Sequence, residues 1–243
     1  MPNARYAILG DIHSNWEALS AVLKDAAEQR ITNYVCVGDI VGYNASPIEC
    51  LEKVRELKFV CVRGNHDHYC SHDEHLGSFH PLAAVVINWS RGQLSSEQRT
   101  WLKHLPYLKT VANFTLVHAT LDMPEKWAYM FDDLDAITNF TYQITPVCFH
   151  GHTHVPIVFR NSERGNTLPL TKMKIERGHK YFVNVGSVGQ PRDGDPRASY
   201  VTYDMETRVI ELRRVPYDIE TAQSKIIDVG LPKWLAERLA MGK

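Results

Sequence analysis

Along the first sixty residues, short apolar runs alternate with stretches in which apolar side chains recur at helical spacing. The runs are four residues long, as expected of buried strands, at positions 6–9, 34–37 and 59–62. Residues 15–30 separate the first two runs and carry an apolar stripe, with Asn15 placed to cap the helix. Ser46, Pro47 and Glu49 predict a second helix that starts with a capping box. This order predicts parallel strands joined by helices that cover the sheet.

Beyond Gly64, the polar stretch 66–79 gives way to a mixture of helices and many strands. Helices are expected at 81–89, from Ser95 or Ser96 to near Pro106, at 133–142, after Asp218 and after Pro232. Strands are expected at 107–111, 114–118, 147–150, 155–159, 181–185, 199–203 and 209–213, the first two as a hairpin. We expect one domain over 1–243 with two sheets and outer helices, a motif-bearing part at 5–203 and C-terminal helices within 217–242.

The chain of 243 residues is 44% hydrophobic and 23% charged, which is the composition of a folded globular protein. Its formal net charge is −1, so a broad basic surface for nucleic acid is not expected. The stretch from Arg160 to Lys180 is locally basic, a pattern more typical of a solvated hairpin or loop than of a binding site. Nucleic acid is therefore not an expected partner.

Five cysteines, none in a C-x-x-C pair, indicate a reducing compartment rather than a disulfide framework or a cysteine zinc site. The N-terminal segment reaches Asp11 too soon to serve as a secretion signal. No apolar run approaches the ~20 residues that a membrane-spanning helix needs. We therefore expect a cytoplasmic protein without a membrane partner.

Residue types that bind metals follow the expected strands, at the point where each strand ends. In open α/β sheets, ligands bind at the carboxyl ends of strands, so these side chains are expected along one edge. The candidates are Asp11, His13, Asp39, Asn65, His118, His152 and His154. Residues i and i+2 of extended backbone point the same way, so each Asp-x-His and His-x-His pair is expected to form a clamp. Glycines at 10, 38, 64 and 151 are expected to let the backbone turn sharply beside them.

Imidazole together with carboxylate is a donor set for Zn, Mn or Fe, whereas Mg or Ca would favour oxygen alone. Seven candidates are too many for one tetrahedral ion. They suit two ions that share one bridging carboxylate, about 3.5–4 Å apart. The sequence therefore predicts two divalent or trivalent transition-metal ions, with Mn, Fe and Zn all open.

These motifs, in this order, resemble those of the calcineurin-like metallophosphoesterases. The matching segments are Asp11-x-His13, Gly38-Asp39, Gly64-Asn65-His66-Asp67, His118 and Gly151-His152-Thr153-His154. A later run, Asn184 to Arg192, is similar to the glycine loop of a small bacterial phosphoesterase branch of that superfamily. The resemblance implies an α/β fold, a four-layer α/β/β/α sandwich with two mixed β-sheets flanked by helices.

The resemblance also implies how the ligands divide between the ions. One ion is expected on Asp11, His13, Asp39 and His154, and the other on Asp39, Asn65, His118 and His152, with Asp39 as the bridge. The implied reaction is in-line attack on phosphorus by a metal-bound hydroxide, while two cations offset the charge of the transition state. His66 is implied to be a catalytic residue beside the substrate, which donates a proton to the leaving oxygen or stabilises its charge.

Several neighbours of these residues admit two interpretations. Asp67 either orients His66 or caps a helix. Arg192 either binds the substrate's phosphate or is a surface residue beside Asp193 and Asp195, and the surface interpretation is slightly favoured. A solvated cap suits the remaining histidines better than a mouth over the site, and these are His68, His72, His75 and His80. A buried position is expected for His150.

The substrate is the least determined feature of the sequence. Protein Ser/Thr phosphatases of this superfamily carry Gly-Asp-x-Val-Asp-Arg-Gly, whereas residues 38–44 read Gly-Asp-Ile-Val-Gly-Tyr-Asn, which argues against a phosphoprotein. We expect a dinuclear phosphoesterase for a small phosphate ester or anhydride, with dinucleoside polyphosphate hydrolysis, as of diadenosine tetraphosphate, open within the class. A protein-binding scaffold like the retromer subunit of this fold would have a degraded ligand set, unlike this chain, and the missing basic surface disfavours a DNA nuclease.

Overall fold

The computed structural model describes residues 4–76, 81–162 and 167–243, which form two six-stranded β-sheets with helices outside them. The helices are α1 Trp16–Glu28, α2 Pro47–Glu56, α3 Asn65–Ser71, α4 Pro81–Gln93, α5 Ser96–Lys103, α6 Asp133–Tyr142, α7 Ile219–Asp228 and α8 Lys233–Met241, with a 3-10 turn at Pro124–Lys126. The strands are β1 Arg5–Leu9, β2 Asn33–Cys36, β3 Val60–Cys61, β4 Leu108–Val111, β5 Phe114–Val117, β6 Val147–His150, β7 Ile157–Arg160, β8 Thr167–Leu168, β9 Lys172–Lys174, β10 Tyr181–Asn184, β11 Ala198–Asp204 and β12 Val209–Val215.

The first sheet has the strand order β3-β2-β1-β11-β12-β9. Its strands β1, β2 and β3 are parallel, with Leu9 opposite Cys36 and Cys36 opposite Cys61, as the strand–helix–strand order predicts. β11 is antiparallel to both β1 and β12, so the sheet is mixed. The parallel half brings the carboxyl ends of three strands to one edge of the sheet.

The second sheet has the strand order β4-β5-β6-β10-β7-β8. β5, β6 and β10 are parallel, while β7 runs antiparallel to β10. The hairpin predicted over residues 107–118 is confirmed, because β4 and β5 pair antiparallel with Val111 opposite Phe114. This sheet is also mixed, and its parallel strands likewise end at a common edge.

The two sheets pack face to face, and the side chains between them form a buried hydrophobic core. Ile8, Val35 and Val201 of the first sheet share this core with Phe149 and Val183 of the second. The side chains alternate along each strand, so the opposite faces are free to pack against helices.

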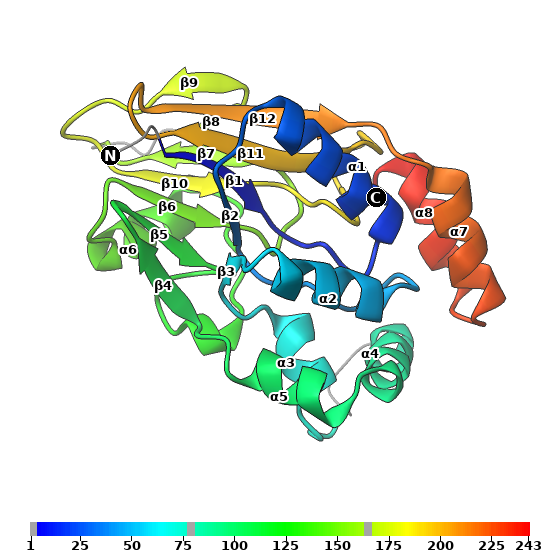
Figure 1. Cartoon of the computed structure of the whole chain (residues 1–243). Helices are drawn as coiled ribbons and strands as arrows, with labels where there is room; N and C mark the ends of the chain where they lie inside the picture. The colour runs from blue at the N-terminus through cyan, green and yellow to red at the C-terminus, as the bar shows by residue number, and fades with distance from the viewer. Residues whose placement is uncertain (1–3, 77–80, 163–166) are drawn as a thin grey trace.

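Helices cover the outer face of each sheet. On the first sheet, Leu19 of α1 and Leu51 of α2 share a buried cluster with Cys36. On the second sheet, Phe140 of α6 lies against Phe182 of β10. Figure 1 shows α1, α2, α7 and α8 on one side of the paired sheets and α6 on the other. The expected four-layer α/β/β/α sandwich is therefore confirmed.

Local capping agrees with the sequence at one helix and disagrees at another. The side chain of Asn15 accepts a hydrogen bond from the amide of Ala18 at 3.0 Å, so Asn15 caps α1 as predicted. The capping box predicted at Ser46 is wrong, because its side chain caps no amide of α2. The amide of Ser46 instead donates to the carbonyl of Ser14 at 3.0 Å, which ties the start of α2 to the loop after β1.

The polar stretch after Gly64 contains a helix that the hydrophobic pattern does not predict. Asn65–Ser71 forms α3, although its sequence is mostly His, Asp and other polar residues. Its helical form follows from contacts with the rest of the fold, and it packs beside α4 and α5. The five cysteines are free and buried, as expected of a chain without a disulfide framework.

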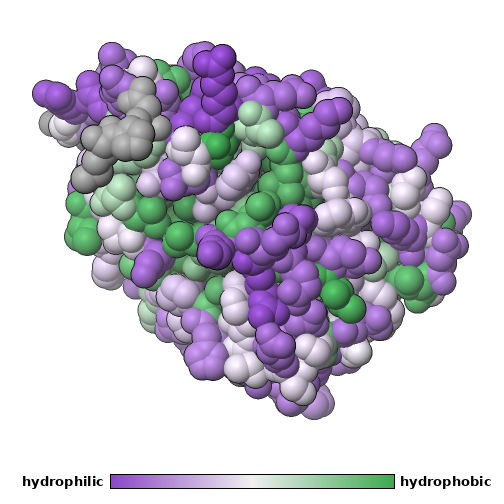
Figure 2. Space-filling model, viewed as in Figure 1, coloured by the Kyte–Doolittle hydropathy of each residue, from purple (hydrophilic) through white to green (hydrophobic). Residues whose placement is uncertain are grey.

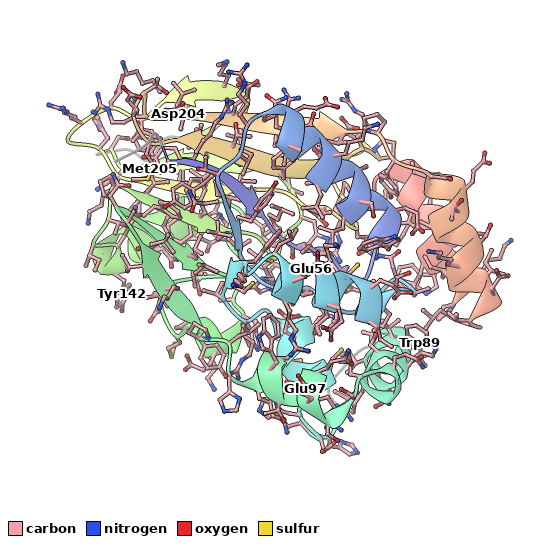
Figure 3. All side chains as sticks on the ribbon, viewed as in Figure 1. Glu56, Trp89, Glu97, Tyr142, Asp204 and Met205 are labelled. Atoms are coloured by element: carbon pink, nitrogen blue, oxygen red, sulfur yellow. The ribbon has the colours of Figure 1, made fainter. Side chains whose placement is uncertain are left out.

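Hydrophilic side chains cover most of the face seen in Figure 2, with apolar side chains scattered between them. Figure 3 places Trp89 of α4 and Tyr142 of α6 on opposite sides of the molecule, in the two outer layers. Within the ranges that the structure describes, none of the helices has the length and apolar character needed to cross a membrane.

A partly buried ion pair ties α1 to the first sheet. The carboxylate of Asp25 accepts hydrogen bonds from the hydroxyl of Tyr200 at 2.6 Å and from Nη2 of Arg213 at 2.8 Å. Burial alone would raise the pKa of Asp25, but the hydrogen bonds outweigh burial and lower that pKa. Because the folded-state pKa is below the unfolded one, the stabilisation is complete above about pH 4 and is lost as the pH falls through the folded-state pKa.

We expect Asp25→Asn to lower the free energy of unfolding by about 1–2 kcal/mol at pH 7, measured by urea denaturation. The difference from the parent protein should shrink as the pH falls below about 4, because the parent carboxylate is then protonated as well. Asp228→Asn, at an exposed position at the end of α7, is the matched control and should cost less than about 0.5 kcal/mol. A difference that stays constant down to pH 2 would show that ionisation of Asp25 is not its source.

Candidate metal centre

The structure brings the seven predicted ligands together where parallel strands of both sheets end. They are Asp11 after β1, Asp39 after β2, Asn65 at the start of α3, His118 after β5, and His152 and His154 after β6; His13 lies in the same loop as Asp11. All of them except the half-buried Asn65 are buried. The sequence predicts a single sheet edge, whereas the group in fact straddles the ends of two sheets.

His13, His154 and Asp11 form one group of potential ligands. The Nε2 atoms of His13 and His154 lie 3.1 Å apart. Asp11 Oδ1 lies 3.2 Å from His154 Nε2 and 3.8 Å from His13 Nε2. The other ring nitrogens face backbone carbonyls, with His13 Nδ1 3.1 Å from the oxygen of Val41 and His154 Nδ1 2.7 Å from that of Gln190.

His118, His152 and Asn65 form a second group with the same construction. His118 Nε2 lies 3.1 Å from His152 Nδ1 and 3.0 Å from the side-chain oxygen of Asn65. The outward nitrogens again meet carbonyls, with His118 Nδ1 2.9 Å from the oxygen of Val37 and His152 Nε2 3.0 Å from that of Trp127.

The hydrogen bonds to carbonyls determine which ring nitrogens are free. A carbonyl oxygen only accepts, so the nitrogen that faces it carries the proton, and the inward nitrogen of each neutral ring presents a lone pair. Nε2 of His13 and Nε2 of His154 are two such nitrogens, 3.1 Å apart, a contact that a cation between them would turn from repulsive to attractive. Nε2 of His118 faces Nδ1 of His152 at the same distance. Ring nitrogens oriented by outer hydrogen bonds, together with carboxylate oxygens, are the usual ligands of transition metals. The residues therefore fit bound metal ions.

Asp39 lies between the two groups. Its Oδ2 atom is 3.5 Å from His13 Nε2 and 3.4 Å from His118 Nε2. The other oxygen, Oδ1, accepts a hydrogen bond from the amide of His66 at 2.8 Å. Asp39 is thus placed where a carboxylate shared by two ions would have to be.

Asp67 fixes the loop that carries Asp39. Its carboxylate accepts hydrogen bonds from four backbone amides, which belong to Asp39, Ile40, Val41 and Gly64. Burial raises the pKa of Asp67 to about 7, and the negative charge of Asp39 acts in the same direction. Of the two interpretations of Asp67, the helix cap is confirmed, and Nδ1 of His66 has no hydrogen-bond partner within the described chain.

Among the carboxylates of the cluster, Asp39 is the one whose ionised form is most strongly stabilised. Burial would raise the pKa of Asp39, but His118 and His66 outweigh burial and hold it well below its usual value. Burial lowers the pKa of His118, yet Asp39 overcomes this effect and raises the value to about 9. Burial also lowers the pKa of His13 and of His154 well below their usual values. These two imidazoles are therefore neutral at pH 7, the form that binds metals.

The backbone at the cluster is left-handed, not extended as the clamp prediction assumes. Positive φ angles occur at Asp11 (51°), His13 (48°), Asp39 (54°), His152 (68°) and His154 (62°). This conformation costs non-glycine residues on the order of 1–2 kcal/mol each, so the surrounding structure must hold it in place. The prediction that His152 and His154 act as one clamp is wrong, because the turn sends His152 to one group and His154 to the other.

Of the four glycines flagged in the sequence, only Gly38 has a positive φ, at 101°. Gly64 and Gly151 instead leave room for carboxylates. A Cβ atom at Gly64 would overlap Oδ1 of Asp39, and one at Gly151 would overlap Oδ2 of Asp11. At these two positions the structure shows a requirement for close approach that the sequence does not reveal.

The run from Asn184 to Arg192 supports the ligand loops from behind. Ser187 donates a hydrogen bond to the carbonyl of Asp11 at 2.8 Å. The Asn184 amide donates to the carbonyl of Gly151 at 2.7 Å and to Thr153 Oγ1 at 2.9 Å. These contacts hold the loops after β1 and β6 against each other, a role that the resemblance of this run alone does not specify.

Tyr43 and Arg192 lie beside His66 at the mouth of the cluster. The His66 ring is 4.8 Å from the His13 ring and 4.4 Å from the Tyr43 ring. The Arg192 guanidinium lies 5.6 Å from the centre of the Tyr43 ring and donates to Oε1 of Gln190 at 2.7 Å. Arg192 is half-buried, and its acidic neighbours pair with other arginines, Asp193 with Arg214 and Asp195 with Arg197.

Sequence reasoning misses three further residues at this mouth. Arg238 of α8 is close enough to Arg192 and Tyr43 to be influenced by both, and burial lowers its pKa to about 10. Trp127 lies 5.9 Å from the His118 ring, and Tyr129 stacks on the His152 ring at 4.3 Å. In the sequence, the one sign of Trp127 and Tyr129 is a group of aromatic residues directly before the helix predicted at 133–142.

Some of the histidines that follow His66 lie near this mouth. His68 stacks on His72 at 4.3 Å, and its Nε2 lies 3.0 Å from Glu74 Oε1. Its ring is also 6.1 Å from that of Trp127, so His68 borders the mouth and is half-buried rather than solvated. His75 is exposed, as expected of a solvated cap.

Two histidines remain, His150 and His80, and neither is placed in the cluster. His150 is buried at the end of β6, where burial lowers its pKa to about 3, as the sequence predicts for a buried side chain. His80 lies outside the described residues.

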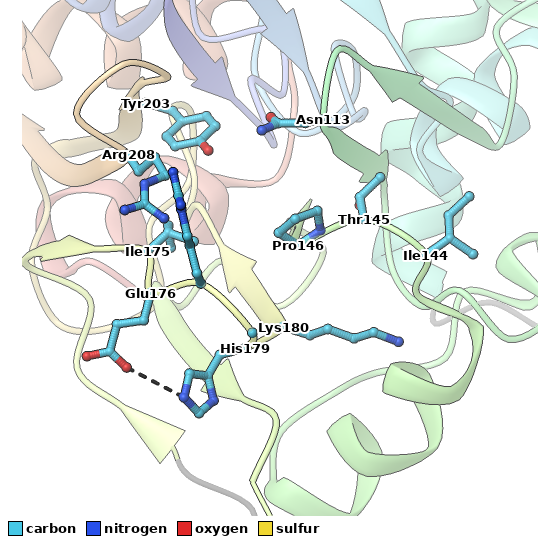
Figure 4. A pocket seen from close by; sticks show the side chains of 12 residues that line it. Asn113, Ile144, Thr145, Pro146, Ile175, Glu176, His179, Lys180, Tyr203 and Arg208 are labelled. Atoms are coloured by element: carbon cyan, nitrogen blue, oxygen red, sulfur yellow. Dashed lines mark ion pairs between the residues drawn. The ribbon is translucent and has the colours of Figure 1, made fainter.

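The basic stretch from Arg160 to Lys180 contributes β8 and β9, edge strands of different sheets, and lies away from the cluster. Part of it lines a cavity of about 400 Å³ together with Asn113 and Tyr203. Figure 4 shows this cavity, with His179 paired to Glu176 at 3.7 Å. None of the seven predicted ligands lines it.

Comparison with known proteins agrees with this geometry. The model of the calcineurin-like phosphoesterase superfamily domain matches residues 5–208. An uncharacterized protein of Methanocaldococcus jannaschii is 41% identical over the whole of both chains. A metallophosphoesterase of Sphaerobacter thermophilus has a crystal structure with a TM-score of 0.89 and 38% identity, covering 99% of this chain and 100% of that one.

Two further proteins are similar either in fold alone or over only part of the chain. A hypothetical protein of Pyrococcus horikoshii shares the fold with a TM-score of 0.82 at 19% identity, over 99% of each chain. A symmetrical bis(5'-nucleosyl)-tetraphosphatase of Nitrosococcus oceani is 32% identical over 133 residues, which cover 51% of this chain and 45% of that relative.

The chain belongs to the calcineurin-like phosphoesterase superfamily. It is a hydrolase that acts on phosphate esters, as its family domain and its structural relatives support. Members of this family use divalent metals, and the clusters of His and Asp described above could hold them.

We expect Gly64→Ala to weaken metal binding by about 10–100-fold, because the added methyl group displaces the carboxylate of Asp39. Metal titration of the chelated protein, followed by elemental analysis, measures this loss. Gly92→Ala in α4 is the matched control, since a Cβ atom there meets nothing within 4 Å. If Gly64→Ala binds metal as tightly as Gly92→Ala does, Asp39 does not depend on the close approach of Gly64.

Proposed function

We propose that this protein is a dinuclear metal-dependent phosphoesterase that hydrolyses a small phosphate ester or anhydride. The observation that carries the proposal is the pair of facing imidazole contacts at 3.1 Å, with the Asp39 carboxylate between them. Two facing pairs and one intermediate carboxylate fit two ions better than one.

Asp11, His13 and His154 would hold one ion, Asn65, His118 and His152 would hold the other, and Asp39 would contact both. When bound, such ions supply Lewis-acid stabilisation of phosphoryl oxygens and a nucleophile at neutral pH. Mn, Fe and Zn all suit this mixture of nitrogen and oxygen donors. Mn is our proposal for the ion that supports activity in vitro.

His66 and Arg192 would act on the substrate rather than on the metals. Nδ1 of His66 faces Gly42, where a Cβ atom would overlap it, so Nε2 is the atom available to donate to the leaving oxygen. Arg192 lies beside Tyr43 on the same side of the cluster, where its guanidinium would bind a phosphate oxygen. The chain's own contribution is therefore to orient the phosphate and to stabilise the departing oxygen.

The substrates within this class include phosphomonoesters, phosphodiesters and dinucleoside polyphosphates. The partial match to a bis(5'-nucleosyl)-tetraphosphatase favours the last of these as the second candidate. We propose a small phosphorylated molecule as the partner, in the cytoplasm, without nucleic acid or membrane. A panel under Mn²⁺ with bis-p-nitrophenyl phosphate, p-nitrophenyl phosphate, a phosphopeptide and diadenosine tetraphosphate tests these alternatives.

We expect the purified protein to bind close to two transition-metal ions per chain, by elemental analysis. Chelation should abolish hydrolysis and Mn²⁺ should restore it. Asp39→Asn should lose more metal than any other single ligand substitution, because both groups approach that carboxylate. Full hydrolysis by a chelated, metal-free preparation would refute the proposed function.

We expect His66→Ala to keep both metal ions and to lower kcat by about 10²–10⁴-fold for esters with a poor, alkoxide leaving group. The loss should be smaller for p-nitrophenyl esters, whose leaving group needs little protonation. His118→Ala and His152→Ala are the comparison, since each should lose metal. If His66→Ala also loses an ion, His66 is a ligand, which its position near His13 and Asp39 would permit.

A further inference from the structure

Three rings form a stacked column that leads outward from the cluster. The Tyr129 ring lies on the His152 ring at 4.3 Å with an interplanar angle of 23°. The Phe131 ring is nearly parallel to the Tyr129 ring, with a centroid distance of 5.2 Å and an interplanar angle of 9°. Tyr129 therefore links the His152 ring to Phe131.

The outer end of this column is exposed to solvent. Phe131 is 64% exposed and Tyr129 is 50% exposed, although both are large aromatic residues. Met130 between them is buried at 2% in the core under α6, and the amide of Phe131 donates to Oδ2 of Asp135 at 3.0 Å. The rings are thus presented by an anchored segment, and their exposure is not that of a loose loop.

Positive charge lies at the same mouth. The Arg192 guanidinium lies 5.6 Å from the centre of the Tyr43 ring and donates to Oε1 of Gln190. Within the described ranges, no Asp or Glu forms an ion pair with Arg192, so its guanidinium can bind added negative charge. Arg238 is close enough to interact electrostatically with Arg192, but it already donates to the main-chain oxygen of Lys243 and lies over the Trp234 ring.

We propose that the column ending in Phe131 is a stacking subsite for a nucleobase, and that the substrate is a nucleoside polyphosphate or dinucleoside polyphosphate. This inference rests on the proposed function, because it assigns the part of the substrate outside the reacting phosphate. Every base has a face that stacks on an aromatic ring, and the outermost ring is the free one.

The distance between Phe131 and the cluster favours a substrate with more than one phosphate. A base on Phe131 is connected to the His152 ring through Tyr129, whose ring centroid lies 5.2 Å from that of Phe131 and 4.3 Å from that of His152. A chain of phosphates spans this separation more readily than the single phosphate of a nucleoside monophosphate. Arg192 provides positive charge for the phosphate chain.

The test compares ATP with inorganic triphosphate as inhibitors of bis-p-nitrophenyl phosphate hydrolysis by the Mn²⁺-loaded protein, in excess Mn²⁺. The two ligands share their phosphate chain and differ in the nucleoside. We expect ATP to inhibit at least 5-fold more tightly, since stacking of one base corresponds to about 5- to 150-fold. Phe131→Ala should bring the ratio of the two inhibition constants to within twofold of unity, and Phe131→Trp should retain it.

Two further variants separate the base from the phosphates. Tyr142→Ala removes an aromatic residue that is 53% exposed at the end of α6 and should leave the ratio at its parental value. Arg192→Gln should weaken ATP and triphosphate equally. Triphosphate that inhibits as tightly as ATP in the parent, or a ratio that Phe131→Ala does not change, would overturn the stacking subsite.

A readout without hydrolysis keeps this inference separate from the proposed function. Ligand-observed NMR titration of ATP and triphosphate with parent and Phe131→Ala proteins measures binding alone. If the metal-loaded protein hydrolyses nothing in the panel, the proposed function fails while the titration still decides the subsite. If hydrolysis proceeds and Phe131→Ala binds ATP as the parent does, only the subsite fails.

Discussion

The arrangement of the cluster depends on one electrostatic constraint, the burial of imidazole nitrogens that face one another. His13 meets His154, and His118 meets His152, each at 3.1 Å, while the outward nitrogen of each ring is held by a backbone carbonyl. The rings cannot relieve this contact by rotation without breaking those outer bonds. Buried polar groups without compensation are costly, so the folded chain presents a site whose most favourable occupant is positive charge.

Most of the ligands that meet this constraint lie in loops at the ends of strands. Five of the seven candidate ligands have left-handed backbone, which is unfavourable for residues with a Cβ atom. Neighbouring groups hold these turns in place. Asp67 accepts four amides around Asp39, and Ser187 and Asn184 bind the carbonyls of the loops after β1 and β6. The ligand loops are thereby fixed to both sheets at once.

The mouth of the site combines residues that lie far apart in the sequence. Tyr43 follows β2, Tyr129 precedes α6, and Arg238 comes from the last helix of the chain. Flat rings and guanidinium groups present both a stacking surface and positive charge, which is a chemically consistent environment for a planar, anionic molecule. The cluster fits the reaction class of the family, and the proposed substrate selection is assigned to these outer residues.

The sequence by itself determined the alternation of strands and helices, the seven candidate ligands and the class of chemistry, because apolar periodicity and motif order are local properties. It did not determine α3, whose polar residues become helical only against α4 and α5. The spacing of His152 and His154 predicted one clamp, whereas the family resemblance implied that they serve different ions, as the structure arranges them. The sequence did not determine that Gly64 allows the close approach of Asp39, since that contact joins separate segments. The packing of two sheets alone decided which side chains face each other across the site, because those contacts join residues up to 141 positions apart.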